Sequence, residues 1–166
     1  MTSDFAGVMG VSDNPRSKGP WLPPRWVIRT AWAVHRGLYR LTGGRFALQR
    51  AKPQKWGTMR LTVTGRRSGK DRPVILAYVE DGPNLTTLAM NGWGEGDPAW
   101  WLNLQANPDA HAVWPDGERL VRARVAEGAE RERLWAVWRE TNKDLDEFAS
   151  RRSTRTDIVV LEPRAG

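Results

Sequence analysis

Apolar and polar residues alternate along several short stretches of the chain, which is the pattern of strands that bury one face. Met59, Leu61 and Val63 alternate in this way and predict a strand over residues 59–64. Similar stretches, bounded by turns rich in glycine, proline and asparagine, predict five further strands. These five are predicted over residues 74–79, 85–90, 110–114, 120–125 and 157–161.

The stretch over residues 25–41 has the spacing of an amphipathic helix. Its apolar residues recur at intervals of four and three residues on one face, and its four arginines fall on the opposite face. Gly43-Gly44 ends the pattern. Two interpretations fit this helix: it packs on the domain with its arginines solvated, or it lies on an anionic membrane surface.

Two shorter helices are predicted between the strands. The first begins with Asp97 as N-cap and Pro98 in its first turn, and it stops before the next proline. The second spans residues 129–140, with Leu134 and Trp138 facing inward. Both are short enough to be insertions between neighbouring strands of one sheet.

The order of these elements predicts a mainly β fold of the α+β class. We expect a small barrel of about six antiparallel strands, with the N-terminal amphipathic helix and two inserted helices. No Gly-x-Gly-x-x-Gly motif follows a strand, which argues against a Rossmann nucleotide site. Residues 1–20 are expected to form a disordered tail, and residues 21–166 a single domain.

Charge is distributed unevenly along the chain. The net charge is +7, and residues 16–72 hold 15 basic residues and one acidic residue, whereas the rest of the chain from Pro73 holds 11 and 16. A basic region of this kind attracts a phosphate-bearing ligand, a nucleic acid or an anionic membrane. The absence of cysteine excludes disulfides and thiol catalysis. With no apolar span or signal-peptide core in the sequence, a cytoplasmic location is expected.

The turn after the first predicted strand, Thr64-Gly65-Arg66-Arg67-Ser68-Gly69-Lys70, concentrates residue types that bind anions. Its glycines let backbone N–H groups approach a ligand, and its guanidiniums and hydroxyl supply further donors. The spacing to a Gly-Lys-Ser/Thr ending is absent, so the turn is not a P-loop. The alternative interpretation is an ordinary surface turn with solvated charges.

A glycine-rich loop and the helix after it form a second unusual segment. Gly92, Gly94 and Gly96 free the backbone to lie against a flat ligand. On the helix, Trp100 and Asn103 share one face, and an indole beside a carboxamide suits an aromatic ring with a polar edge. The alternative is that tryptophans at this helix start pack in the core.

Together these two segments resemble the signature blocks of the deazaflavin-dependent nitroreductase family. Residues 61–76 are similar to the family's Thr-Gly-Arg-(Arg/Lys)-(Ser/Thr)-Gly followed by a basic residue, here Arg72. Residues 89–110 resemble its Gly-Gly-x-x-x-x-Pro-x-Trp-(apolar or aromatic)-x-Asn-Leu-x-Ala-Asn-Pro, although Trp93 replaces the second glycine. A weaker resemblance extends the match from near Leu38 to near Pro163.

The resemblance implies a split β-barrel that binds coenzyme F420, a deazaflavin with a phosphodiester and an oligoglutamate tail. The residues that match the family's phosphate-binding block are Arg66, Arg67, Ser68 and Gly69, with Arg72 and Asn103 assisting. The residues expected around the deazaflavin ring are Ile75, Ala77, Ala89, Met90, Asn91, Gly92, Gly94 and Trp100.

The activity implied by the resemblance is hydride transfer from reduced F420 to a small hydrophobic acceptor such as a quinone, an enone or a nitroaromatic. The acceptor is expected at Asn91, Trp93 and Phe148, and no catalytic side chain or metal is required because the cofactor carries the chemistry. The alternatives are an FMN-binding split-barrel reductase and a nucleic-acid-binding module, against which the scattered tryptophans argue. Because related barrels often pair, a homodimer is a further expectation, as is peripheral contact of residues 25–41 with the inner face of a membrane.

Overall fold

The computed structural model describes residues 48–92 and 94–164 of the chain. The expected tail over residues 1–20 and the expected helix over residues 25–41 lie outside these described residues, as does Trp93.

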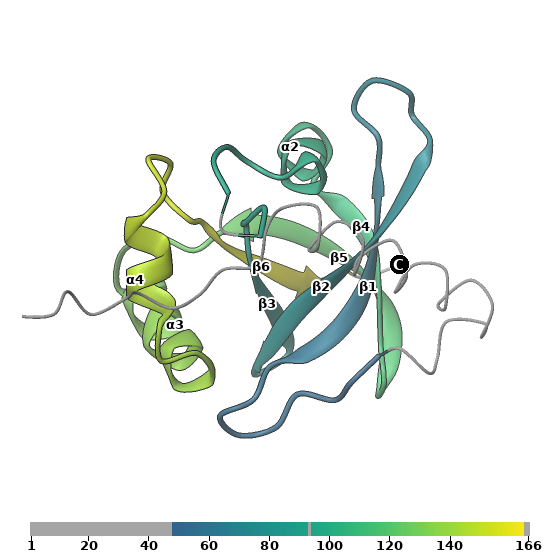
Figure 1. Cartoon of the computed structure of the whole chain (residues 1–166). Coiled ribbons are helices and arrows are strands. Elements are labelled where there is room, and N and C mark those ends of the chain that lie inside the picture. Colours follow the sequence, from purple (N-terminus) through teal and green to yellow (C-terminus); the bar gives the residue numbers. More distant parts are fainter. Residues whose placement is uncertain (1–47, 93, 165–166) are drawn as a thin grey trace, which may run out of the picture.

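Six antiparallel strands form a closed barrel in the spatial order β1-β2-β3-β6-β5-β4 (Figure 1). Closure comes from two pairings between strands that are distant in sequence, β1 with β4 and β3 with β6. The predicted antiparallel barrel is confirmed, and each predicted strand is present with its ends shifted by a few residues. The strands are β1 (Gly57–Thr64), β2 (Asp71–Asp81), β3 (Asn84–Leu88), β4 (Asp109–Trp114), β5 (Gly117–Val125) and β6 (Ile158–Pro163).

The burial of the strands follows from what covers each face of the barrel. In β1 the alternate residues Met59, Leu61 and Val63 point into the barrel and are buried, as the sequence pattern predicts. In β6 every residue over 158–161 is buried, because the barrel interior covers one face and helices cover the other. A strand covered on both faces shows a continuous apolar run in place of an alternating one.

Three described helices pack around the barrel: α2 (Ala99–Ala106), α3 (Gly128–Thr141) and α4 (Leu145–Ser150). The short helix α4 is an addition to the two inserted helices expected from the sequence. The start of α2 also differs, because Pro98 occupies the N-cap position expected for Asp97, without a side-chain cap hydrogen bond. Among the described residues, no helix is long and apolar enough to cross a membrane.

The helices bury their apolar faces in two separate cores. Trp101 and Leu104 of α2 pack into the main core inside the barrel. Leu134 and Trp138 of α3 belong to a second core between the helices and the outer face of β3 and β6. Figure 1 shows α3 and α4 together on one side of the barrel. The Trp138 indole N–H donates a hydrogen bond to the Thr86 hydroxyl at 3.2 Å, which satisfies its one polar atom in this buried position.

The start of β1 leaves no room for a side chain at Gly57. A Cβ atom there would lie 2.5 Å from both the Ala51 nitrogen and Tyr78 Cε1. We expect Gly57→Ala to lower the free energy of unfolding by about 2–3 kcal/mol, because backbone atoms have to move. Gly117→Ala is the matched control, since its Cβ would meet Trp114 at an ordinary 3.5 Å. Denaturant unfolding measures both variants, and equal effects would contradict the steric argument.

An arginine joins β5, α3 and β6 through two carboxylates. Arg124 donates to Glu130 at 2.6 and 2.8 Å and to Glu162 at 2.7 Å. The hydrogen bond from Arg124 lowers the pKa of Glu130 below its ordinary value of 4.5. This pairing stabilises the fold above the ordinary pKa, and the contribution is lost as the pH falls through the lower folded value.

We therefore expect the thermal midpoint of Glu130→Gln to fall less steeply than that of the wild type between about pH 5 and pH 3. Glu132→Gln, on the exposed face of the same helix, is the control. Thermal unfolding followed by circular dichroism at several pH values makes the comparison. Parallel slopes for the wild type and Glu130→Gln would show that the pairing adds nothing to acid sensitivity.

Candidate functional site

A cavity of about 1060 Å³ lies between the barrel and its helices. It is lined by residues 65–68 of the Gly65–Lys70 turn between β1 and β2, by parts of β2, α2, α3 and α4, by the end of β3 and by the loop over residues 90–92. This volume is at the upper end of the range for small-molecule and cofactor sites, about 300–1000 Å³. The cavity can therefore hold a ligand as large as a dinucleotide or a substituted flavin.

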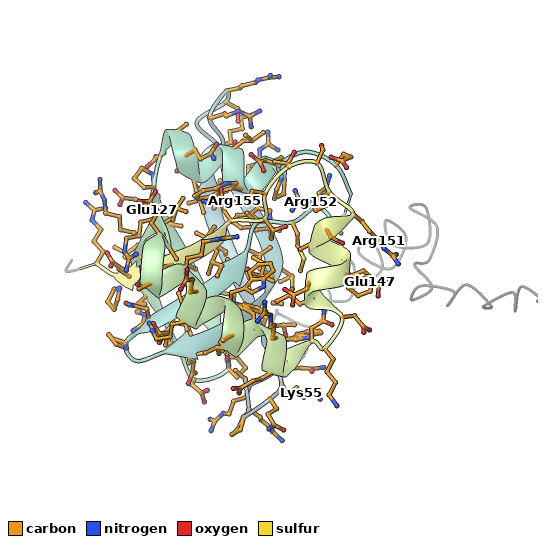
Figure 2. All side chains as sticks on the ribbon, turned by 90° about the vertical axis from the view of Figure 1, so that its left-hand side faces the viewer. Lys55, Glu127, Glu147, Arg151, Arg152 and Arg155 are labelled. Atoms are coloured by element: carbon orange, nitrogen blue, oxygen red, sulfur yellow. The ribbon has the colours of Figure 1, made fainter. Side chains whose placement is uncertain are left out.

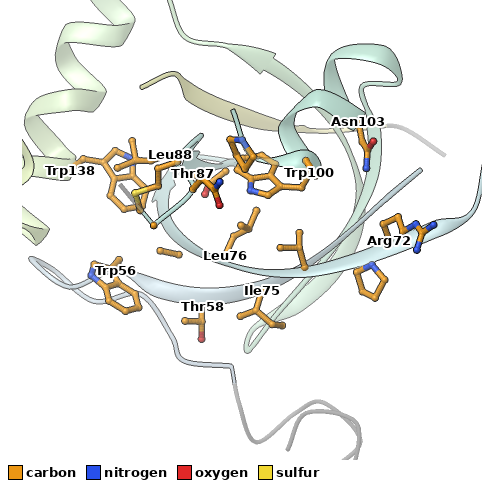
Figure 3. Close-up of a pocket in the computed structure, with 18 of the residues that line it drawn as sticks. Trp56, Thr58, Arg72, Ile75, Leu76, Thr87, Leu88, Trp100, Asn103 and Trp138 are labelled. Carbon is orange, nitrogen blue, oxygen red and sulfur yellow. The ribbon is translucent and has the colours of Figure 1, made fainter. Parts of the chain in front are cut away.

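The cavity has a basic polar end and an aromatic end. Figure 3 shows Arg72 and Asn103 on one side and Trp56 and Trp138 on the other, with Leu76 between them. None of the described lining residues is an aspartate, a glutamate or a histidine. Such a cavity suits a ligand that is anionic at one end and apolar and flat at the other.

Two glycines allow the sharp turn that forms the basic end. The Gly65 carbonyl accepts hydrogen bonds from the amides of Ser68 and Gly69 at 3.2 and 2.7 Å. A Cβ atom at Gly65 would lie 2.9 Å from the Ser68 hydroxyl, and Gly69 has a φ of +65°, which favours glycine. These constraints close the turn tightly and bring Arg66, Arg67 and Ser68 to the cavity wall.

Helix α2 fixes one of the turn's arginines. The buried Asn103 carboxamide oxygen accepts hydrogen bonds from the Arg66 backbone amide at 3.2 Å and from Arg66 Nη1 at 3.0 Å. The Ser68 hydroxyl accepts a longer contact of 3.4 Å from Arg72 Nη2. The turn, α2 and β2 thus converge on one place and hold the basic groups together.

The basic groups have no carboxylate to neutralise them within the described part of the chain. Arg66, Arg67 and Arg72 all line the cavity, and none forms an ion pair with another described residue. Guanidiniums left without counter-ions bind phosphate and carboxylate groups through paired hydrogen bonds. This observation fits the anion interpretation of the turn.

The apolar part of the cavity is built mainly from β2 and α2. Ile75 and Ala77 line it from alternate positions of β2, as expected. Trp100 and Trp101 are both buried in the main core, 7% and 3% exposed, so the core interpretation holds for both residues. Trp100 also lines the cavity, so the cavity-wall interpretation holds for it as well.

The glycine-rich loop contributes some of its expected residues to the cavity and uses others to hold its shape. Met90, Asn91 and Gly92 line the cavity. Ala89 and Gly94 do not: Ala89 is buried in the main core, and the Gly94 amide closes a turn onto the Asn91 carbonyl at 3.0 Å.

Two further expected residues lie away from the cavity lining. Gly69 shapes the basic turn without lining the cavity. Phe148 of α4 lies beside the Arg151 guanidinium, 5.6 Å from ring centroid to Cζ, and the residue of α4 that lines the cavity is Leu145. Trp93, expected at the acceptor pocket, is outside the described residues.

The structure adds lining residues that the sequence did not single out as site residues. The sequence predicted Trp138 only as an inward-facing residue of a helix, and this helical spacing is the one sequence feature that could have pointed to its position in the cavity. Nothing in the local sequence marks the others, because they reach the cavity only through the closure of the barrel and the packing of α3 and α4. Among these additions are Gln49, Trp56, Thr58, Thr87, Leu88, Thr141, Asn142 and Leu145.

Comparison with known proteins agrees with this geometry. The model of a family described as F420H(2)-dependent quinone reductase matches residues 32–163. A Mycobacterium tuberculosis protein described as a candidate F420H(2)-dependent quinone reductase is 34% identical over 107 residues, which cover 64% of this chain and 90% of that protein.

Solved structures share the barrel. The structure of an F420-H2-dependent reductase, FDR-A, matches with a TM-score of 0.59 and 28% identity, covering 69% of this chain and 97% of that one. A structure described as a domain-swapped dimer matches with a TM-score of 0.60 and 26% identity, covering 81% and 99%.

The relationship expected from the two signature blocks is confirmed, and so is the split β-barrel that it implied. The family description names a quinone as acceptor, which is one of the three acceptor classes expected from the sequence. The chain belongs to the F420H(2)-dependent quinone reductase family.

Proposed function

We propose that this protein binds coenzyme F420 in the cavity with the ligand's anionic tail at the Gly65–Lys70 turn, and that it transfers hydride to a quinone at the aromatic end. The observation that carries the proposal is the cluster of three guanidiniums without carboxylate partners among the described residues, at one end of an otherwise mainly apolar cavity. F420 joins a phosphodiester and several carboxylates to a flat ring, so its polarity matches that of the cavity.

The basic end would hold the phosphodiester and the first carboxylates of the tail. Arg66, Arg67 and Arg72 offer paired N–H donors, and the Ser68 hydroxyl adds another. Asn103 acts on the ligand through Arg66, because its carboxamide oxygen already accepts two hydrogen bonds from that residue. The arginine is thus placed before the ligand arrives, which reduces the entropy lost on binding.

The middle of the cavity would hold the deazaflavin ring. Ile75 and Ala77 supply a flat apolar surface on β2, and Trp100 borders the same space from α2. Met90, Asn91 and Gly92 border the cavity from the loop after β3, where Gly92 adopts a φ of +57°. Apolar walls on several sides orient the ring and exclude water from it.

The aromatic end would hold the quinone. Trp56, 39% exposed, offers a ring face for stacking (Figure 3). The buried side chains of Leu88, Trp138 and Leu145 also line the cavity and complete its apolar surface. The Thr87 side chain, 2% exposed, also lines this region, and its hydroxyl is suited to donate a hydrogen bond to a quinone oxygen. Reduced deazaflavin supplies the hydride when bound, and these side chains orient the acceptor for it.

The role of the arginine turn is tested by removing two of its guanidiniums. We expect Arg66→Ala with Arg67→Ala to weaken F420 binding by about 2–4 kcal/mol, or roughly 30- to 1000-fold, because two charge-assisted contacts are lost. Titration of F420 fluorescence with each protein measures the affinity. The matched control is Arg139→Ala with Arg155→Ala, which removes the same charge from exposed positions paired only with surface aspartates.

A parallel titration with FMN separates the two candidate cofactors. Wild-type protein that binds FMN but not F420 at tens of micromolar would overturn the cofactor assignment. An equal loss of F420 affinity in the control variant would show that net charge, and not the turn, attracts the ligand.

The same proposal extends to the protein's surroundings. The helix predicted over residues 25–41 has an apolar face and an opposite basic face, which supports contact with an anionic membrane. Quinones are dissolved in such membranes. A homodimer is also proposed, and it is supported by the domain-swapped dimer among the solved structures that resemble this chain.

Sedimentation with anionic vesicles tests the membrane contact. We expect the full chain to sediment with the vesicles and a chain beginning at Thr42 to remain in the supernatant, because it lacks the predicted basic helix. Neutral vesicles are the control for the electrostatic part. Equal sedimentation of the two chains would remove residues 25–41 from the proposal. Light scattering of the full chain without vesicles measures its mass, and the mass of a monomer would contradict the proposed homodimer.

A further inference from the structure

A buried arginine lies behind the loop that faces the deazaflavin site. Arg152 lies two residues after the end of α4 and is 7% exposed, whereas its neighbours Arg151 and Ser153 are exposed. Figure 2 shows Arg151, Arg152 and Arg155 along the segment that leads from α4 into β6. Arg152 is not among the residues that line the cavity, so it has no part in the binding roles described above.

The Arg152 guanidinium makes four hydrogen bonds, three of them to the backbone of one loop. Its Nη1 donates to the Ala89 carbonyl at 3.1 Å, its Nε to the Gly94 carbonyl at 3.1 Å, and its Nη2 to the Gly96 carbonyl at 2.9 Å. Nη1 also donates to the hydroxyl of the buried Thr156 at 2.7 Å. The planar group thus ties the two ends of the loop to a single point.

The part of the loop between these tied ends is the cavity wall. Met90, Asn91 and Gly92 line the cavity, and they lie between Ala89 on one side and Gly94 on the other. The distance between the two fixed carbonyls limits the path that the intervening backbone can take. Arg152 therefore controls the shape of a wall that it does not itself form.

Charge makes this anchor strong. No carboxylate among the described residues forms an ion pair with Arg152, and its guanidinium is held by three carbonyl dipoles and one hydroxyl. A buried cation that loses its hydrogen-bond acceptors carries a large free-energy cost, so the loop resists moving away from it. A lysine ammonium lacks the fork of donors that reaches several separate carbonyls at once.

A second contact, between Glu95 and Ser153, also holds the same loop. The Glu95 carboxylate accepts hydrogen bonds from the Ser153 backbone amide at 3.1 Å and from the Ser153 hydroxyl at 2.6 Å. Residues 152 and 153 therefore hold the loop from Ala89 to Gly96 through two adjacent side chains.

We propose that Arg152 is a positioning residue for the ring of F420: by fixing the Met90–Gly92 wall it sets the affinity for the deazaflavin ring and not for the anionic tail. This inference rests on the proposed function, because it assigns the wall to the ring. It predicts that substitutions in the arginine turn weaken binding of the anionic tail, whereas substitution of Arg152 weakens binding of the ring.

Two ligands separate these effects: F420, and the deazaflavin nucleoside analogue that lacks the phosphodiester and the oligoglutamate. We expect Arg152→Lys to lower the affinity for both ligands by the same factor, about tenfold, since both share the ring. Arg66→Ala with Arg67→Ala should lower the affinity for F420 alone. Arg155→Lys, an equivalent change at an exposed arginine of the same segment, should leave both affinities unchanged.

A measurement without ligand tests the anchor itself. Hydrogen exchange of the backbone amides of Asn91 and Gly94 should accelerate about tenfold in Arg152→Lys, while amides of the barrel strands keep their wild-type rates. Thr156→Val removes one acceptor of Arg152 and keeps the shape of the side chain. Thr156→Val should accelerate hydrogen exchange and lower the ligand affinity as Arg152→Lys does, but by smaller factors. It replaces Arg152→Lys in the test if that variant does not fold.

The outcomes are distinct. Folded Arg152 or Thr156 variants with wild-type exchange and wild-type affinity for both ligands would overturn the inference. A loss confined to F420, with the ring analogue bound normally, would also overturn it, because Arg152 would then act on the tail. Failure of the wild-type protein to bind either ligand would instead contradict the proposed function, and the exchange rates would still decide whether Arg152 holds the loop.

Discussion

Closure of the barrel is the constraint on which the rest of the structure depends. The pairings of β1 with β4 and of β3 with β6 join strands that are far apart in sequence, and they fix where each strand ends. As a result the β1–β2 turn lies beside α2, and the end of β3 lies beside α3. The cavity exists because these strand ends and helices surround the same space, so its geometry depends on closure more than on any single residue.

Much of the fold followed from the sequence because its signals are local. The alternation of Met59, Leu61 and Val63 and the inward face of Leu134 and Trp138 each depend on neighbouring residues only. Helix α4 was not predicted, because its six residues have no strong period and its one buried residue, Leu145, packs on a core formed by other segments. The position of Pro98 at the N-cap of α2 was also not visible in the sequence.

In the candidate site, too, the sequence revealed the features that depend on consecutive residues and missed those that depend on packing. The basic turn could be found because its residues are consecutive, and the cavity indeed includes Arg66, Arg67 and Ser68. Its aromatic end could not be found, because Trp56 and Trp138 meet only after the helices pack on the barrel. Arg152 was equally hidden: its acceptors on the loop lie 56 to 63 positions away in the sequence, and they are backbone carbonyls that carry no residue signature.

The use of backbone carbonyls as the acceptors of Arg152 has an evolutionary consequence. Since the anchor holds carbonyl oxygens, it does not depend on the identity of the side chains at the wall residues Met90 and Asn91. A substitution at Met90 must keep its packing on the second core, whereas one at the exposed Asn91 can alter which molecules fit against the ring and leave the path of the backbone unchanged. A loop fixed by its main chain is therefore a place where new acceptor preferences can arise without rebuilding the scaffold.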